Sequence, residues 1–284
     1  MPDLDETLQS VAQHYNQNIF AYESVRQQYS PVEFAITARW LNRVVPEQAT
    51  VVDIGVGGGY YAKLLAQRGC WLYLIDISQK LIEATYTKLK AANLDKQVLE
   101  VQQASATRLA GLKTAIVDVV LLLGPLYHLC SLEARQSAVR EASRILKPNG
   151  IVFAAGINRL AYFRELFRSQ PELVLTRQDF HQQLLHDGNV DPEHVPPLGY
   201  AHFTTQLEFR QLLETEFEQI ALIGTESFSA PFPTFMDALQ PEQVEAWIDL
   251  VEETGQTPEG LGMTDHFLFI GKKRVERLAH PPQN

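Results

Sequence analysis

The segment Asp53-Ile54-Gly55-Val56-Gly57-Gly58-Gly59 places an acid and three glycines at alternate positions, directly after a β-branched run. Gly55 and Gly57 allow the backbone to turn sharply and to approach a ligand closely, while amides at the start of a following helix would donate to an anion. A second acid, Asp76, ends the next apolar run and can accept two hydrogen bonds from a ribose diol. These residue types predict a nucleotide-like site.

Position 60 discriminates between two classes of nucleotide ligand. The dinucleotide fingerprint G-x-G-x-x-G needs a third glycine there, and this chain has Tyr60, whose bulk would push the following helix away from the strand. Asp53, two residues before the first glycine, suits instead a ligand that carries a cationic ammonium group. The alternative without any ligand is a glycine-rich turn between strand and helix, and the acid at Asp76 counts against it.

A second group of chemically capable side chains follows the expected fourth strand, in the segment Leu123-Gly124-Pro125-Leu126-Tyr127-His128. Parallel sheets bind ligands at the carboxyl ends of their strands, so Leu123 is expected to face the ligand. His128 is the candidate general base. The alternative for His128 is an imidazole that bonds to nearby backbone and shapes the loop, and Tyr127 either lines the ligand pocket or packs in the core.

Several other groups of side chains have a functional and a structural interpretation. One set has ligand chemistry, but its irregular spacing favours a solvated turn over a coordinated ion, so no metal site is expected: His181, His186, Asp187, Asp191, Glu193 and His194. A seven-residue repeat favours a core-facing helical stripe over contact with a cofactor: Tyr15, Tyr22 and Tyr29. Three aromatic residues either close over an apolar substrate or pack the sheet edge: Phe228, Phe232 and Phe235.

The elements that position these residues alternate along the chain. Short β-branched or apolar runs predict strands at 50–54, 71–75, 97–102, 117–123, 151–155, 220–223 and 266–270. Helical periodicity between them predicts helices at 60–68, 79–92, 132–146, 158–168, 207–216 and 241–253. This alternation predicts an α/β fold with right-handed crossovers and a parallel sheet that has helices on both faces.

Two segments fall outside that alternation. Residues 1–44 have helical spacing interrupted before Pro31, which predicts two or three helices that form an N-terminal helical cap. Residues 158–200 lose their pattern after an initial helix and become dense in turn formers, so we interpret them as a cap insertion within a main domain at 45–275. Residues 276–284 are expected to form a flexible tail.

Composition limits the class of protein. The 284 residues are 45% apolar and 20% charged, which is typical of a globular chain. A net charge of −10 argues against an extended polyphosphate partner such as nucleic acid. Cys70 and Cys130 form no ligand pair, which favours a reducing cytoplasm, and Cys130 is expected as a small buried residue. The polar N-terminus and the short run Val119–Leu123 indicate neither secretion nor a membrane span.

Five blocks of sequence resemble the motif series of class I S-adenosylmethionine-dependent methyltransferases, over about residues 45–156: VVDIGVGGGYYAKLLAQRG, LYLIDIS, QASATRL, DVVLLLGPLYHL and REASRILKPNG. The last two are similar to a bacterial subgroup of small-molecule methyltransferases with a GPLYHL sequence. The resemblance implies a Rossmann-like, mostly parallel sheet of seven strands whose last strand is antiparallel.

The resemblance also implies roles for individual residues. Asp53, Gly55, Gly57 and Gly59 would hold the methionyl part of the cofactor, Asp76 the ribose hydroxyls, and Ile77 would lie beside the adenine. Ser105-Ala106 would cup the adenine edge, with the serine in place of the usual aspartate. Leu123 and Tyr127 complete the expected cofactor pocket.

The expected reaction is methyl transfer from S-adenosylmethionine to an O, N or S atom of a small molecule. The sulfonium methyl is already activated, so the protein mainly has to hold a nucleophile in line behind it, and no metal is needed. The rivals are a nucleotide-dependent oxidoreductase, a cofactor-binding or scaffold protein without turnover, and an RNA methyltransferase. Tyr60 argues against the first, and the acidic balance with missing base-flipping motifs argues against the last.

Overall fold

The structure is a computed structural model that describes residues 3–18, 31–232 and 238–274. Five strands are parallel and lie in the order β3-β2-β1-β4-β5: Val98–Gln103, Trp71–Asp76, Thr50–Ile54, Val117–Leu122 and Leu146–Asn158. β9 (His266–Lys273) is antiparallel to β5 on one side and to β8 (Phe217–Gly224) on the other. The mostly parallel sheet and its antiparallel last strand are therefore confirmed.

Over the residues that the structure describes, the sheet has nine strands, so the expected number of seven is wrong. The additional strands are the short hairpin partners β6 (Asn189–Val190) and β7 (Ala201–Thr204). β4 ends opposite Ala154, whereas β5 continues to Asn158, and β7 pairs with this extension in parallel. The sequence did not indicate β7 because four residues between turn formers are too short for a strand pattern.

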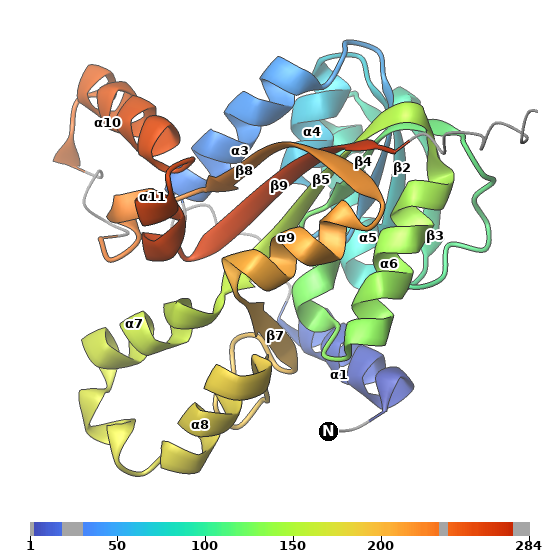
Figure 1. Ribbon diagram of the computed structural model, residues 1–284. Coiled ribbons are helices and arrows are strands. Elements are labelled where there is room, and N and C mark those ends of the chain that lie inside the picture. The colour runs from blue at the N-terminus through green and yellow to red at the C-terminus, as the bar shows by residue number, and fades with distance from the viewer. Residues whose placement is uncertain (1–2, 19–30, 233–237, 275–284) are drawn as a thin grey trace, which may run out of the picture.

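Helices cover both faces of the sheet, as expected (Figure 1). Alternate residues along each central strand face opposite cores, for example Val51 and Val52. One core includes the apolar faces of α3 (Pro31–Val44), α4 (Tyr60–Gln67), α5 (Gln79–Ala91) and α10 (Pro241–Thr254). The other includes those of α6 (Leu132–Ile145) and α9 (Gln206–Glu214), and α11 (Pro258–Met263) adds Leu261. The single-turn helices η1 (Asp95–Gln97) and η4 (Ser227–Ser229) connect elements.

The segment between β5 and β7 forms a lobe beside the sheet (Figure 1). It contains α7 (Arg159–Ser169), η3 (Pro171–Val174) and α8 (Gln178–Asp187). The sequence pattern gives no indication of α8, where Phe180 and Leu184 on successive turns pack into a third apolar cluster, and the expected turn-rich run follows the end of this helix. Gly188, at φ +75°, ends α8 in the left-handed conformation.

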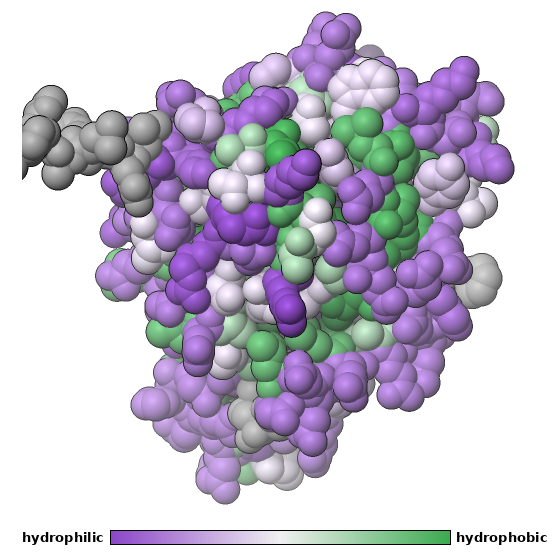
Figure 2. Space-filling view, turned by 90° about the vertical axis from the view of Figure 1, so that its right-hand side faces the viewer, coloured by the Kyte–Doolittle hydropathy of each residue, from purple (hydrophilic) through white to green (hydrophobic). Residues whose placement is uncertain are grey.

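At the N-terminus, α1 (Leu4–Gln17) begins at Asp3, whose side chain accepts a hydrogen bond from the Glu6 amide. The tail expected at 276–284 lies outside the described residues. Figure 2 shows the side of the molecule that is on the right in Figure 1, where hydrophilic residues predominate and apolar residues surface between them. Across the described ranges, no helix combines the length and apolar character that crossing a bilayer requires.

Candidate functional site

A cavity of about 1060 Å³, measured to its open mouth, lies at the carboxyl edge of the sheet. It brings together residues from the ends of β1, β2, β3 and β4 and from α1. Ten of the eleven residues predicted for the site line this cavity: Asp53, Gly55, Gly57, Asp76, Ile77, Ser105, Ala106, Leu123, Tyr127 and His128. The sheet topology therefore gathers side chains that are widely spaced in the sequence.

The loop between β1 and α4 forms part of the cavity wall. Gly55, at φ +81°, donates its amide to the Ile75 carbonyl at 2.7 Å, and a Cβ there would lie 2.8 Å from Pro125 Cδ. Glycine is therefore needed at position 55 for both the left-handed turn and the close approach of the next loop. Gly59 does not line the cavity; at φ +71°, it faces the Thr85 side chain, which a Cβ would meet at 2.7 Å.

Two buried acids face this cavity from adjacent strands. Asp53 is 3% exposed and Asp76 is 6% exposed. Asp76 accepts hydrogen bonds from the Ser78 amide at 2.8 Å and the Gly57 amide at 3.4 Å. Burial, followed by the charge of Asp76, raises the pKa of Asp53 to about 8, and burial raises the pKa of Asp76 to about 6. A cationic ligand next to this pair would favour both ionised forms.

Because these pKa values are raised, we expect ligand binding to be linked to proton release. The two raised pKa values contribute to the free energy of unfolding in full below about pH 4. This contribution is lost as the pH rises through 6, where Asp76 ionises, and through 8, where Asp53 ionises. A ligand with an ammonium group should bind more tightly as pH rises across 6–8 and should displace up to one proton at pH 7. Calorimetry in phosphate and in Tris, whose ionisation enthalpies differ, measures that proton. Identical enthalpies in the two buffers, or unchanged release in Asp53→Asn, would contradict the expectation.

Ile77, Ser105 and Ala106 lie at the β2 and β3 side of the cavity. The Ser105 hydroxyl accepts a hydrogen bond from the Thr107 amide at 3.2 Å and lies 2.9 Å from the Thr107 hydroxyl. The serine side chain thus fixes its own turn, unlike an aspartate that reaches toward a base. Ala106 is 4% exposed and presents an apolar surface at this end.

His128 is buried in η2 (Pro125–His128), with both ring nitrogens in contact with polar groups. Nδ1 lies 3.2 Å from the Tyr200 carbonyl, which can only accept, so Nδ1 carries the proton in the neutral ring. Nε2 then accepts from the Tyr15 hydroxyl at 2.8 Å. The sequence pattern favours a core position for Tyr15, whereas the structure places it on the cavity wall beside His128.

The seven-residue spacing of Tyr15, Tyr22 and Tyr29 indicates a buried helix face. Leu8 and Val11, which lie on the same face of α1 as Tyr15, also line the cavity. A hydrogen bond next to Tyr15 holds helix α1 in place: the Ser78 hydroxyl donates to Asn16 Oδ1 at 2.7 Å. Tyr60 also lines the cavity, with the Lys88 ammonium 5.1 Å from its ring centroid. Tyr60, the residue that argues against a dinucleotide ligand, is therefore part of the cavity wall.

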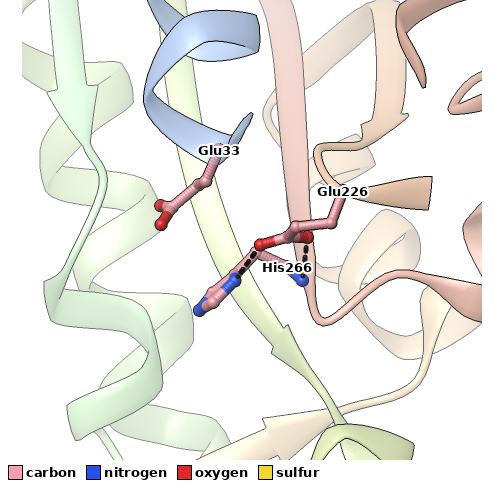
Figure 3. A group of neighbouring side chains, drawn as sticks. All are labelled: Glu33, Glu226 and His266. Carbon is pink, nitrogen blue, oxygen red and sulfur yellow. Dashed lines mark hydrogen bonds and ion pairs between the residues drawn. The ribbon is translucent and has the colours of Figure 1, made fainter. Parts of the chain in front are cut away.

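A further cluster of titratable groups, missed from the sequence, contains Glu33, Glu226 and His266 (Figure 3). Glu226 accepts from His266 Nδ1 at 2.6 Å, from the His266 amide at 3.0 Å, and from the hydroxyls of Thr225 and Thr264. Despite burial, the charge and hydrogen bonds of His266 lower the pKa of Glu226 to about 2. Both carboxylate oxygens of Glu226 accept hydrogen bonds, so the contacts of this residue form a hydrogen-bond network.

Glu226→Gln is therefore expected to lower the free energy of unfolding by about 3 kcal/mol at pH 7, because the lowered pKa of Glu226 corresponds to that stabilisation. This contribution is complete above about pH 4.5 and declines as pH falls toward 2. Urea unfolding at pH 7 and pH 3 measures it, with the exposed Glu242→Gln as control. A loss under 1 kcal/mol at pH 7, or a loss as large at pH 3 as at pH 7, would contradict the network.

The remaining groups have structural contacts. His194 Nδ1 lies 2.9 Å from Asp191, and the His194 ring stacks on Phe180 at 3.8 Å. Among the described residues, the six predicted polar residues of 181–194 do not gather as metal ligands. Phe228 packs edge-on against Trp247, whereas Phe232 is 65% exposed. Cys130 is buried, as expected, and burial raises the pKa of its thiol to about 11. The predictions for Tyr22, Tyr29 and Phe235 fall outside the described residues.

Comparison with known sequences identifies the central segment. Residues 52–154 match the family described as "Methyltransferase domain". The ubiquinone biosynthesis O-methyltransferase of Caulobacter vibrioides is 31% identical over 129 residues, which cover 45% of this chain and 49% of that protein. The chain thus spans about half the length of the curated relatives it matches.

Comparison with solved structures shows the fold over most of the chain. The cyclase SpnF has a TM-score of 0.61 at 17% identity, with 94% of this chain and 96% of that chain covered. The N-methyltransferase NodS from Bradyrhizobium japonicum WM9, solved with S-adenosyl-L-homocysteine, has a TM-score of 0.56 at 11% identity, with 94% and 100% covered. The expected Rossmann-like fold is confirmed.

Proposed function

We propose that this chain, whose residues 52–154 match a methyltransferase domain, is a class I enzyme that transfers a methyl group from S-adenosylmethionine to an O, N or S atom of a small molecule. The observation that carries the proposal is the pair of buried acids, Asp53 and Asp76, in one cavity with the glycine loop. A carboxylate that suits an ammonium and another that suits a ribose diol match the two polar ends of this cofactor.

The lining residues then have distinct roles toward the cofactor. Asp53 and the backbone of Gly55 and Gly57 hold the methionyl part, and the turn at Gly59 sets the direction of α4. Asp76 accepts the ribose hydroxyls. The adenine lies among Ile77, Ser105 and Ala106, and the methyl end faces Leu123 and Tyr127. The S-adenosyl-L-homocysteine complex of NodS, which shares the fold, supports this class of ligand.

For a hydroxyl acceptor, His128 is the proposed general base, acting through Tyr15. The tyrosine hydroxyl passes its proton to Nε2 as it takes the proton of the acceptor, so the charge that develops on the acceptor is neutralised. The Tyr200 carbonyl fixes the imidazole in the required tautomer and orientation. His128 Nδ1 and Nε2 therefore have separate functions.

The acceptor is proposed to bind beneath a cap formed by α1 and the insertion 158–200. Three contacts support this arrangement: α1 supplies the cavity residues Leu8, Val11 and Tyr15, His14 Nε2 contacts the Pro197 carbonyl at 3.0 Å, and Tyr200 holds His128. A cavity of this size with an open mouth suits a small molecule, as does the GPLYHL resemblance. The unpaired cysteines Cys70 and Cys130 are compatible with the cytoplasmic location expected from the sequence.

Two alternatives differ from this proposal in testable ways. An NAD(P)-dependent oxidoreductase is disfavoured because Tyr60 occupies the place of the third glycine and lines the cavity. The second alternative is a cofactor-binding protein without methyl transfer, and the solved structure of the [4+2]-cyclase SpnF shows that this fold also occurs in a protein named for another reaction. Binding of the cofactor alone therefore does not establish the reaction.

Incubation of the protein with S-adenosylmethionine labelled in the methyl group and a cell metabolite extract tests the reaction directly. The proposal expects label in at least one small molecule, at a rate that falls when Asp76 is replaced. Tight binding of the cofactor without label above that of a heat-inactivated sample would favour the alternative without methyl transfer.

A further inference from the structure

A second cavity, of about 600 Å³ to its open mouth, lies between η2, α6, α9 and β7. Its wall is apolar at Leu126, Phe209 and Leu212 and polar at Arg135 and His202. Tyr127 lines this cavity as well as the cofactor cavity, so its side chain separates them. None of the functions proposed above uses the second cavity.

Arg135 is the unusual group in this cavity. It is 9% exposed, and only Nη1 has partners, the carbonyls of Leu129 at 2.7 Å and Cys130 at 2.9 Å. Within the described ranges, Nε and Nη2 have no hydrogen-bond partner, and no carboxylate lies within ion-pair distance of the guanidinium. Burial lowers the pKa of Arg135 to about 10, so the group remains cationic at neutral pH. A buried cation without a counter-ion is costly, and an anionic ligand would relieve that cost.

The two acids that line the cavity do not neutralise Arg135. Glu208 is paired with Arg159, whose Nη2 lies 2.7 Å from Oε2, and also accepts from the Thr205 amide. Asp187 accepts the Asn189 amide at 2.9 Å and is half-buried. Arg159 is itself buried, so Glu208 already serves as the counter-ion of another buried cation.

His202 adds a requirement on the ligand. Its Nδ1 donates to Asn189 Oδ1 at 3.1 Å, so Nε2 carries the lone pair. Burial, followed by the charges of Arg135 and Arg159, lowers the pKa of His202 to about 3, and the ring stays neutral. A ligand would therefore meet a cationic donor at Arg135, a neutral acceptor at His202 and an apolar surface between them.

We infer that this cavity binds a small organic carboxylate with an apolar body and a hydroxyl or amino group, its carboxylate on Arg135 and its donor on His202 Nε2. Such a ligand has two sources, the methyl acceptor itself or an effector that contacts the cofactor cavity through Tyr127. Binding does not depend on the proposed methyl transfer, whereas the acceptor role rests on it.

Calorimetric titration with 2-, 3- and 4-hydroxybenzoate and with 2-hydroxy-4-methylpentanoate, each beside its neutral amide, tests the inference. At least one carboxylate should bind 10-fold or more tightly than its amide. Arg135→Gln should lose at least 10-fold in that affinity, Arg140→Gln on the exposed face of α6 should not change it, and Asp187→Asn should strengthen it. Equal binding of acids and amides, no binding by any of the four, or unchanged affinity in Arg135→Gln would overturn the inference.

If Arg135→Gln does not fold, because its contacts with Leu129 and Cys130 are lost, Leu212→Trp tests the same cavity by filling it and should abolish binding. Retained affinity in that variant would place the ligand elsewhere. Labelled cofactor then separates the two sources: label in the bound carboxylate identifies an acceptor, and binding without label identifies an effector. Absence of methyl transfer to any molecule counts against the proposed function and leaves the binding result intact.

Discussion

His128→Ala is expected to lower turnover by about 10² to 10⁴ while it leaves cofactor affinity nearly unchanged. The imidazole takes up the proton through Tyr15, and the alanine variant has no group in its place. The loss should shrink at higher pH, where a hydroxyl acceptor ionises unaided. Turnover against pH, cofactor affinity and melting temperature, measured on one variant, distinguish catalysis from structure.

Tyr15→Phe is a second test of the proposed proton transfer through Tyr15 to His128. Because Tyr15 and His128 act as one unit, the phenylalanine variant should lose about as much turnover as His128→Ala, and the double variant should lose little more. Full activity of His128→Ala at every pH would eliminate its catalytic role. Parallel losses of melting temperature and cofactor affinity, with no change in the pH profile, would assign His128 a structural role.

Asp76→Ala should weaken S-adenosylmethionine binding by about 2 to 3 kcal/mol, roughly 30- to 150-fold, because two charge-assisted hydrogen bonds to the ribose are lost. The fold should persist, since the substitution also removes the negative charge that raises the pKa of Asp53. Calorimetric titration measures the affinity.

The exposed Asp179→Ala on α8 controls for the change in net charge and should bind as the unsubstituted protein does. Asp76→Asn keeps an acceptor for the Ser78 amide, so it separates loss of the carboxylate charge from disturbance of the loop. Unchanged affinity in a well-folded Asp76→Ala protein would remove Asp76 from the site.

The part of the site that follows from the sequence is the part built on strand ends. Asp53 and Asp76 lie at the carboxyl ends of two recognisable strands. These strands are parallel neighbours in the sheet, so the two residues necessarily lie at the same edge. The glycine spacing and the absence of a glycine at position 60 then restrict the ligand. Local pattern and sheet topology were sufficient for these residues.

The groups that were missed depend on contacts between distant segments. Tyr15 and His128 are 113 residues apart in the sequence, and Glu226 and His266 are 40 residues apart. No local sequence pattern therefore indicates either hydrogen-bonded pair. The short strand β7 was also missed, because it directly follows the turn-rich insertion and its partner is the part of β5 that extends beyond β4. Arg135 has the spacing of an ordinary helical arginine, and only the packing of α6 against η2 and β7 shows that it is buried.

The central claim, that the cavity holds an adenosyl cofactor, is tested most directly by calorimetric titration of the protein with S-adenosylmethionine, S-adenosyl-L-homocysteine, NAD and NADP under identical conditions. The claim predicts binding of both adenosyl ligands with one site per chain and no measurable heat of binding for the dinucleotides. Binding of NAD in preference to the adenosyl ligands would contradict it.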